Sequence, residues 1–181
     1  YLAGLDAAAS QDPIAIGKIR VEAAQAKQNL VSTQKLPVMN KNLYCYTRQL
    51  GCYSQLFAHS NEIPEALKTQ ELILQRYQHF LSLTDYKTLE NDTFSGRTLP
   101  YPYLMRGNLL LRLQAIQTAH SGYANLAIAD LQKEISQISS LLNQDESVLG
   151  QMIFLNVLQA DIDLIAIIAQ KYKTPFSPIA P

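Results

Sequence analysis

Residues 103–143, YLMRGNLLLRLQAIQTAHSGYANLAIADLQKEISQISSLLN, contain two helical patterns separated by one glycine. Gly122 is the residue type that most often ends a helix. We therefore expect helices over residues 103–121 and 123–143, and a connection this short makes them antiparallel neighbours. The second helix carries the cleaner apolar stripe, formed by Leu126, Leu131, Ile135, Ile138 and Leu142.

The segment that follows, residues 145–172, is the most apolar part of the chain. Isoleucine, leucine, valine and phenylalanine occur on most sides of its helical wheel, which predicts a helix buried on most sides and central to the fold. Upstream, Asp12 followed by Pro13 is typical of a helix start and predicts a helix to about residue 31. A further stripe predicts a helix over residues 60–83.

These patterns predict an all-α fold: a single domain over residues 1–181, with about six helices around a buried C-terminal helix. Residues 84–102 form the longest expected loop, and the proline-rich residues 174–181 form an extended tail. The alternative is a helical-repeat-like array, although no self-similar period of about 34 residues is visible.

The composition excludes several classes of protein. The 181 residues include 15 Lys and Arg against 15 Asp and Glu, and 48% are hydrophobic. So much apolar content excludes a disordered chain, and zero net charge without a basic run argues against nucleic-acid binding and polybasic membrane binding. There is no uninterrupted apolar run of about 20 residues, so no membrane-spanning helix is expected.

Cys45 and Cys52 are seven positions apart, with Gly51 between them. In a continuous helix their α-carbons would be about 10.5 Å apart, beyond the limit of about 7 Å for a disulfide. A bridge therefore requires the helix to break, and Gly51 is able to provide the break. The alternative is a pair of buried free thiols.

Asp161 is the most informative single residue, because it falls on the most apolar face of the predicted C-terminal helix. A buried carboxylate needs a partner, and Arg106, Arg112 and Arg76 are the candidates. Such a group can serve as an acid or base, or anchor a ligand in a pocket among the helices. The simpler interpretation is an internal salt bridge.

Tyrosines near the expected loops form a candidate surface for a protein partner, since tyrosine offers a large contact area at low entropic cost. The candidates are Tyr46, Tyr101 and Tyr103, together with Phe176 in the tail. The alternative is that these tyrosines cap the helix bundle.

No catalytic, cofactor or metal motif occurs in the sequence. His59, His79 and His120 fall on different predicted elements, without a second ligand at metal-binding spacing. We therefore expect no cofactor and no metal, and we regard an enzyme as the weakest class; it would need polar groups that converge in one cleft, such as Arg76, His79 and Asp85.

Short motifs spread over the chain carry a family resemblance. They are Tyr1–Ala7, Asp12, Pro13 and Gly17; Tyr44, Cys45, Cys52, Gln55, Leu56 and Asn61; Arg76, Tyr77, Leu81, Asp85 and Tyr86; Pro100, Tyr101 and Pro102; and Met152 and Ile153. Together they resemble an uncharacterised family of gammaproteobacterial hypothetical proteins that are anchored by an N-terminal membrane segment, are exposed to the periplasm and have no assigned activity.

The resemblance implies a place in the cell. A periplasmic location would make Cys45 and Cys52 a disulfide, and residues 1–11 would be the end of a removed inner-membrane anchor. The function we expect is a non-enzymatic periplasmic domain that binds a protein partner or serves as an accessory subunit of an envelope complex. The alternative is a small-ligand-binding bundle with a pocket near Asp161.

Overall fold

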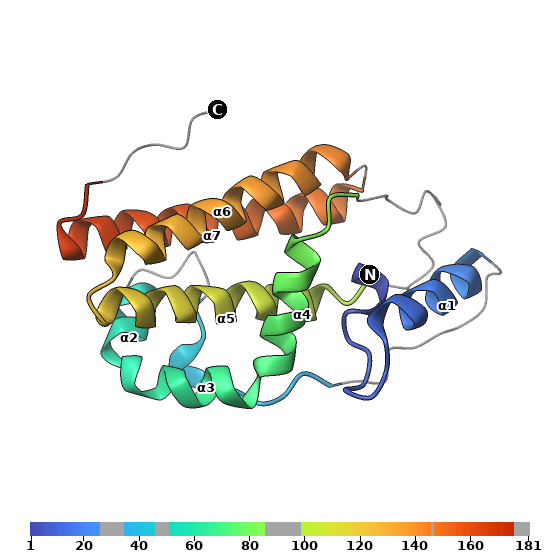
Figure 1. Cartoon of the computed structure of the whole chain (residues 1–181), viewed down its shortest axis with the longest axis horizontal. Helices are drawn as coiled ribbons and strands as arrows, with labels where there is room; N and C mark the ends of the chain where they lie inside the picture. Colours follow the sequence, from blue (N-terminus) through green and yellow to red (C-terminus); the bar gives the residue numbers. More distant parts are fainter. Residues whose placement is uncertain (26–34, 46–50, 86–98, 146, 176–181) are drawn as a thin grey trace.

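The computed structural model describes residues 1–25, 35–45, 51–85, 99–145 and 147–175 (Figure 1). These residues form seven α-helices and no β-strand, so the predicted all-α domain is confirmed. The helices are α1 (Pro13–Gln25), α2 (Cys52–Ala58), α3 (Ile63–Thr69), α4 (Glu71–Leu81), α5 (Tyr101–His120), α6 (Ala124–Gln144) and α7 (Val148–Tyr172). Short 3-10 turns cover Leu2–Gly4, Lys41–Leu43 and Ser60–Glu62.

Local sequence signals set several helix ends. The carboxylate of Asp12 accepts hydrogen bonds from the backbone N–H groups of Ile14 and Ala15, at 3.0 and 3.2 Å, so α1 starts where Asp12 and Pro13 predict. After α5, Gly122 adopts φ +93°, a left-handed conformation that glycine tolerates. Ser147 caps α7 by accepting from the N–H of Gly150 at 2.9 Å.

Helix α5 is the central helix, and the prediction that the C-terminal helix is central is wrong. Figure 1 shows α6 and α7 side by side as an outer layer, with α5 beneath them and α4 crossing α5. Helix α5 contacts α2, α3, α4, α6 and α7, and it buries polar residues as well as leucines. Since α5 contacts helices far from it in the chain, the arrangement differs from a repeat array, whose units contact only their neighbours.

Helices α4 and α5 cross closely at Gly107. A Cβ atom at this position would lie 2.4 Å from the Cβ and Cγ atoms of Tyr77. The missing side chain therefore permits the crossing, and it fixes where the ring of Tyr77 enters the core.

The expected helix over residues 60–83 is interrupted at Gln70, and two helices, α3 and α4, take its place. Gln70 is buried, and its Oε1 atom accepts a hydrogen bond from Arg106 at 2.6 Å. No glycine or proline marks this break, so a contact with a distant helix accounts for it.

Residues 1–11 pack as part of the domain. Leu2 and Leu5 are buried in the hydrophobic core, and Arg20 of α1 forms an ion pair with buried Asp6. The expectation that these residues are the end of an anchor therefore does not describe their place in the fold. In the predicted C-terminal tail, residues 174–175 are non-helical, and residues 176–181 lie outside the described part.

Helix α7 is, among the described helices, the one long and apolar enough to cross a membrane by length and composition. Asn, Gln and Asp interrupt its apolar runs, so the sequence contains no uninterrupted run of about 20 apolar residues there. In the structure its inner face packs on α5 and α6, and this face includes Asp161. Helix α7 therefore packs as one of the helices of the bundle.

Candidate functional site

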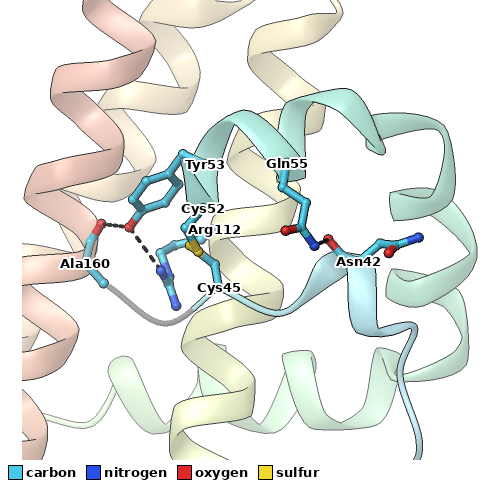
Figure 2. Close-up of a disulfide and its surroundings, with 7 residues drawn as sticks. All are labelled: Asn42, Cys45, Cys52, Tyr53, Gln55, Arg112 and Ala160. Atoms are coloured by element: carbon cyan, nitrogen blue, oxygen red, sulfur yellow. Dashed lines mark hydrogen bonds between the residues drawn. A yellow bond between two sulfur atoms is a disulfide. The ribbon is translucent and has the colours of Figure 1, made fainter. Parts of the chain in front are cut away.

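Cys45 and Cys52 form a disulfide, with their α-carbons 5.3 Å apart (Figure 2). Gly51, at φ +81°, precedes Cys52, where α2 begins, so the break that a bridge requires is present at Gly51. Both cysteines are buried. A buried disulfide indicates an oxidising compartment outside the cytoplasm.

Replacing both cysteines with alanine is expected to lower the free energy of unfolding by about 2.5 kcal/mol, because an eight-residue covalent loop no longer restricts the unfolded chain. Urea denaturation with and without a thiol reductant measures the change. The reductant should bring the unmodified protein to the level of the variant and leave the variant unchanged. A midpoint that the reductant does not move in the unmodified protein would contradict a stabilising disulfide.

Beside the disulfide, Tyr53 connects α2 to α5 and α7. Figure 2 shows its hydroxyl donating to the backbone carbonyl of Ala160, at 2.7 Å, and accepting from the guanidinium of Arg112, at 3.1 Å. Tyr53 and Arg112 are both buried. The disulfide thus anchors α2 next to a buried polar cluster.

Glu134 of α6 and Asp161 of α7 lie together in that cluster, and neither is exposed by more than 1%. The amide nitrogen of Asn108 donates to both carboxylates, at 3.0 Å to Glu134 Oε1 and 3.0 Å to Asp161 Oδ1. The hydroxyl of Tyr77 donates to the same oxygen of Glu134. Helices α4, α5, α6 and α7 therefore meet at two acidic side chains.

Burial raises the pKa of both carboxyl groups. The pKa of Glu134 rises from 4.5 to about 7, although the hydrogen bonds from Tyr77 and Asn108 and the charge of Arg112 act in the opposite direction. Burial, followed by the charge of Glu134, raises the pKa of Asp161 well above its ordinary value. Two adjacent acids in a dry core with one cation nearby retain protons at a pH where exposed acids are ionised.

Asp161 is buried, as its place on the apolar face predicts, but its hydrogen-bond partner is Asn108 and not an arginine. Arg112 is the one predicted arginine near enough to influence the pKa of Asp161. Sequence reasoning missed Glu134 and Asn108. Glu134 carried a signal, since it lies three residues after Leu131 on the apolar stripe of α6.

The other two predicted arginines hold chain segments in place. Arg106 donates to the carbonyl of Pro37, at 3.1 Å, and to the hydroxyl of Tyr44, and its guanidinium lies 5.1 Å from the centre of the Tyr44 ring. Arg76 donates to the backbone carbonyls of residues 5, 7, 8 and 11. Both guanidinium groups are thus occupied within the fold.

The proposed tyrosine surface is not formed by Tyr101 and Tyr103, which are 5% and 9% exposed. Helix α5 begins at Tyr101, with Pro102 in its first turn, so both rings turn into the core, where the sequence predicted a loop before residue 103. Proline is compatible with the first turn of a helix, because its missing N–H has no partner there. Tyr46 and Phe176 lie outside the described residues.

Asp161 does not line the cleft that the structure has between α2 and α7. An open cleft of about 590 Å³ lies between α2 and α7, lined by Ser54, Phe57, Ala58, Ile167, Gln170 and Lys171.

Within the described part no three His, Cys, Asp or Glu residues are grouped to hold a metal. His79 contacts the ring of Tyr1, and Arg76 binds backbone carbonyls, so these two do not converge on a cleft.

The outward side of α7 carries exposed apolar residues that the prediction of a helix buried on most sides did not identify. Val148, Leu149, Met152, Leu155 and Ile162 are 74%, 42%, 56%, 54% and 51% exposed. Four of them, all except Leu149, recur at steps of four, three and seven residues and define one stripe, which we name the α7 stripe.

No family model, curated protein or solved structure matches this chain.

Proposed function

We propose that this chain is a non-enzymatic periplasmic domain of an inner-membrane-anchored protein, and that it binds a protein partner as an accessory subunit of an envelope complex. The α7 stripe is the binding surface. The observation that carries the proposal is the exposure of Val148, Met152, Leu155 and Ile162 along one face of a long helix. Contiguous exposed apolar surface is rare on soluble domains unless another surface covers it.

The spacing of the stripe defines the chemistry of the partner. Apolar residues at steps of four, three and seven lie on one helix face, and such a face fits against another α-helix, as in a coiled-coil seam. Gln159 lies on the stripe between Leu155 and Ile162, and the exposed amides Gln151 and Asn156 lie beside it. An uncharged seam selects an amphipathic helix with an apolar face and few charges.

Two features support the location. The disulfide is typical of an oxidising compartment, and the family resemblance is to periplasmic proteins with an N-terminal inner-membrane anchor. Asp161 on the inner face of α7 disfavours that helix as a lipid-embedded segment, because a carboxylate in hydrocarbon is costly.

Leu155→Glu tests the proposal. A charge in the middle of the seam is expected to weaken partner binding at least 100-fold, because the carboxylate would be desolvated without a partner. The native complex is measured in solubilised membranes by its size in non-denaturing electrophoresis. The matched control is Ser136→Glu, which adds the same charge at an exposed position on α6.

The complex should be lost with Leu155→Glu and retained with Ser136→Glu, while both purified domains keep the melting temperature of the unmodified protein. A complex that survives Leu155→Glu would overturn the α7 stripe as the surface. If the purified domain alone forms a dimer that Leu155→Glu dissociates, the stripe joins two copies of this chain, and the proposal of a different partner is wrong.

A further inference from the structure

We propose that Glu134, Asp161 and Asn108 form a proton-dependent lock between α6 and α7. The lock is closed while the two carboxyl groups retain protons, and it loosens as both ionise. The proposal does not depend on the identity of the binding partner, because it concerns the packing of the two helices that form the outer layer.

The donors in the cluster are too few for two ionised carboxylates. Asn108 supplies one amide group to both acids, and Tyr77 adds one hydroxyl on the Glu134 side. Within the described residues, Glu134 Oε2 and Asp161 Oδ2 are buried without a hydrogen-bond partner, and the Nε atom of Arg112 is buried without an acceptor, so it does not supply the missing donor. A carboxylate presents acceptor sites on both oxygens, so full ionisation leaves buried acceptors unsatisfied.

The charges around the pair do not balance two carboxylates. From α2 the neighbour is Tyr53, from α4 Tyr77, and from α5 the neutral Asn108 and the single cation Arg112. Asp163, also on α7, raises the pKa of Tyr53 and adds no positive charge. One retained proton makes the Glu134, Asp161 and Arg112 group neutral, whereas loss of both leaves a net negative charge in the core, which is costly.

The direction of the pH dependence follows from linkage. Because burial raises the folded-state pKa of Glu134 to about 7 and that of Asp161 well above its ordinary value, the folded chain binds more protons than the unfolded chain. Stability is then fully present below the ordinary pKa values of these acids, and it falls as the pH rises through the folded values. The loosening is expected between about pH 5 and pH 8.

The test is a pH series on the full chain. The melting temperature of the unmodified protein should fall by about 5 °C or more between pH 5 and pH 8. Amide hydrogen exchange should show that the loss of stability lies in α6 and α7. Between pH 5 and pH 8 the amide protection factors of these two helices, corrected for the intrinsic exchange rate, should fall at least tenfold more than those of α3. Glu134→Gln should remove at least half of the fall, because one acid no longer ionises.

The control is Asp130→Asn, which removes an exposed acid from the same helix and should leave the slope unchanged. Groups elsewhere in the chain that titrate in this range contribute equally to the unmodified protein and to Glu134→Gln, so their contribution cancels in the difference. A melting temperature that is flat or rises over this range, or a slope that Glu134→Gln does not reduce, would overturn the lock. Should Glu134→Gln fail to fold, the exchange profile of the unmodified protein decides.

Discussion

Arg112→Met is expected to lower the free energy of unfolding by about 4 kcal/mol at pH 8. Arg112 is 3% exposed, and it is the cation that lowers the pKa of both Glu134 and Asp161. Methionine keeps much of the apolar volume but leaves two buried acids without a positive charge nearby. Tyr53 keeps its hydrogen bond to the carbonyl of Ala160, so α2 retains one of its two contacts through this hydroxyl.

The pH dependence distinguishes lost charge from lost packing. At pH 5, below the raised pKa of about 7 of Glu134, this acid is largely protonated, so the cluster needs Arg112 less and the cost of Arg112→Met should fall by at least half. Arg112→Lys, which keeps the charge but not the planar donor group, should cost less than Arg112→Met at pH 8. Urea denaturation at both pH values measures the differences. An equal cost at pH 5 and pH 8 would contradict the electrostatic role of Arg112.

Gly107→Ala is expected to destabilise the protein by about 3 kcal/mol, because the new Cβ would meet the Cβ and Cγ atoms of Tyr77 at 2.4 Å. These atoms lie at the root of the side chain, so the helices themselves must move apart. Displacement of Tyr77 would also weaken its hydrogen bond to Glu134. The sign of the change is diagnostic, since glycine to alanine within a helix otherwise stabilises by about 1 kcal/mol.

Gln114→Ala is the matched control, since it changes an exposed residue on the same helix and should leave stability within about 0.5 kcal/mol. Thermal denaturation followed by circular dichroism measures both variants. A Gly107→Ala protein that is as stable as the unmodified chain would mean that α4 and α5 do not cross at this residue.

The sequence predicts best those features that depend on local chemistry. Asp12 and Pro13 mark the start of α1, Gly122 ends α5, and Gly51 breaks the chain where the disulfide requires it. Each of these residues has a conformational or hydrogen-bonding preference that acts within a few positions. Such preferences do not need the rest of the fold.

Features that depend on tertiary contacts were predicted poorly. The break between α3 and α4 depends on buried Gln70 and its contact with Arg106, which no local pattern reveals. Helix α7 was expected at the centre because it is apolar on most sides. The structure instead places α5 there, since Gly107 allows a close crossing and the side chains of Asn108 and Arg112 form hydrogen bonds within the core.

The buried cluster was only half predictable. Asp161 was identified from its apolar helix face, but a helical wheel does not show which residue of another helix will face it. Glu134 and Asn108 are brought to Asp161 by the packing of α5, α6 and α7. The apolar residues of the α7 stripe are exposed outside this packing, and they are the basis of the proposed function.

The most direct test of the proposed function is site-specific photo-crosslinking in the cells that produce the protein. A photoreactive residue is placed in turn at Met152, Leu155 and Ile162 on the α7 stripe, and at exposed Gln75 and Lys133 on α4 and α6 as controls. We expect one adduct, with an amphipathic helix of a single envelope protein, from the three stripe positions and not from the controls. Equal crosslinking from stripe and control positions, or no protein adduct from a folded chain, would contradict the proposed function.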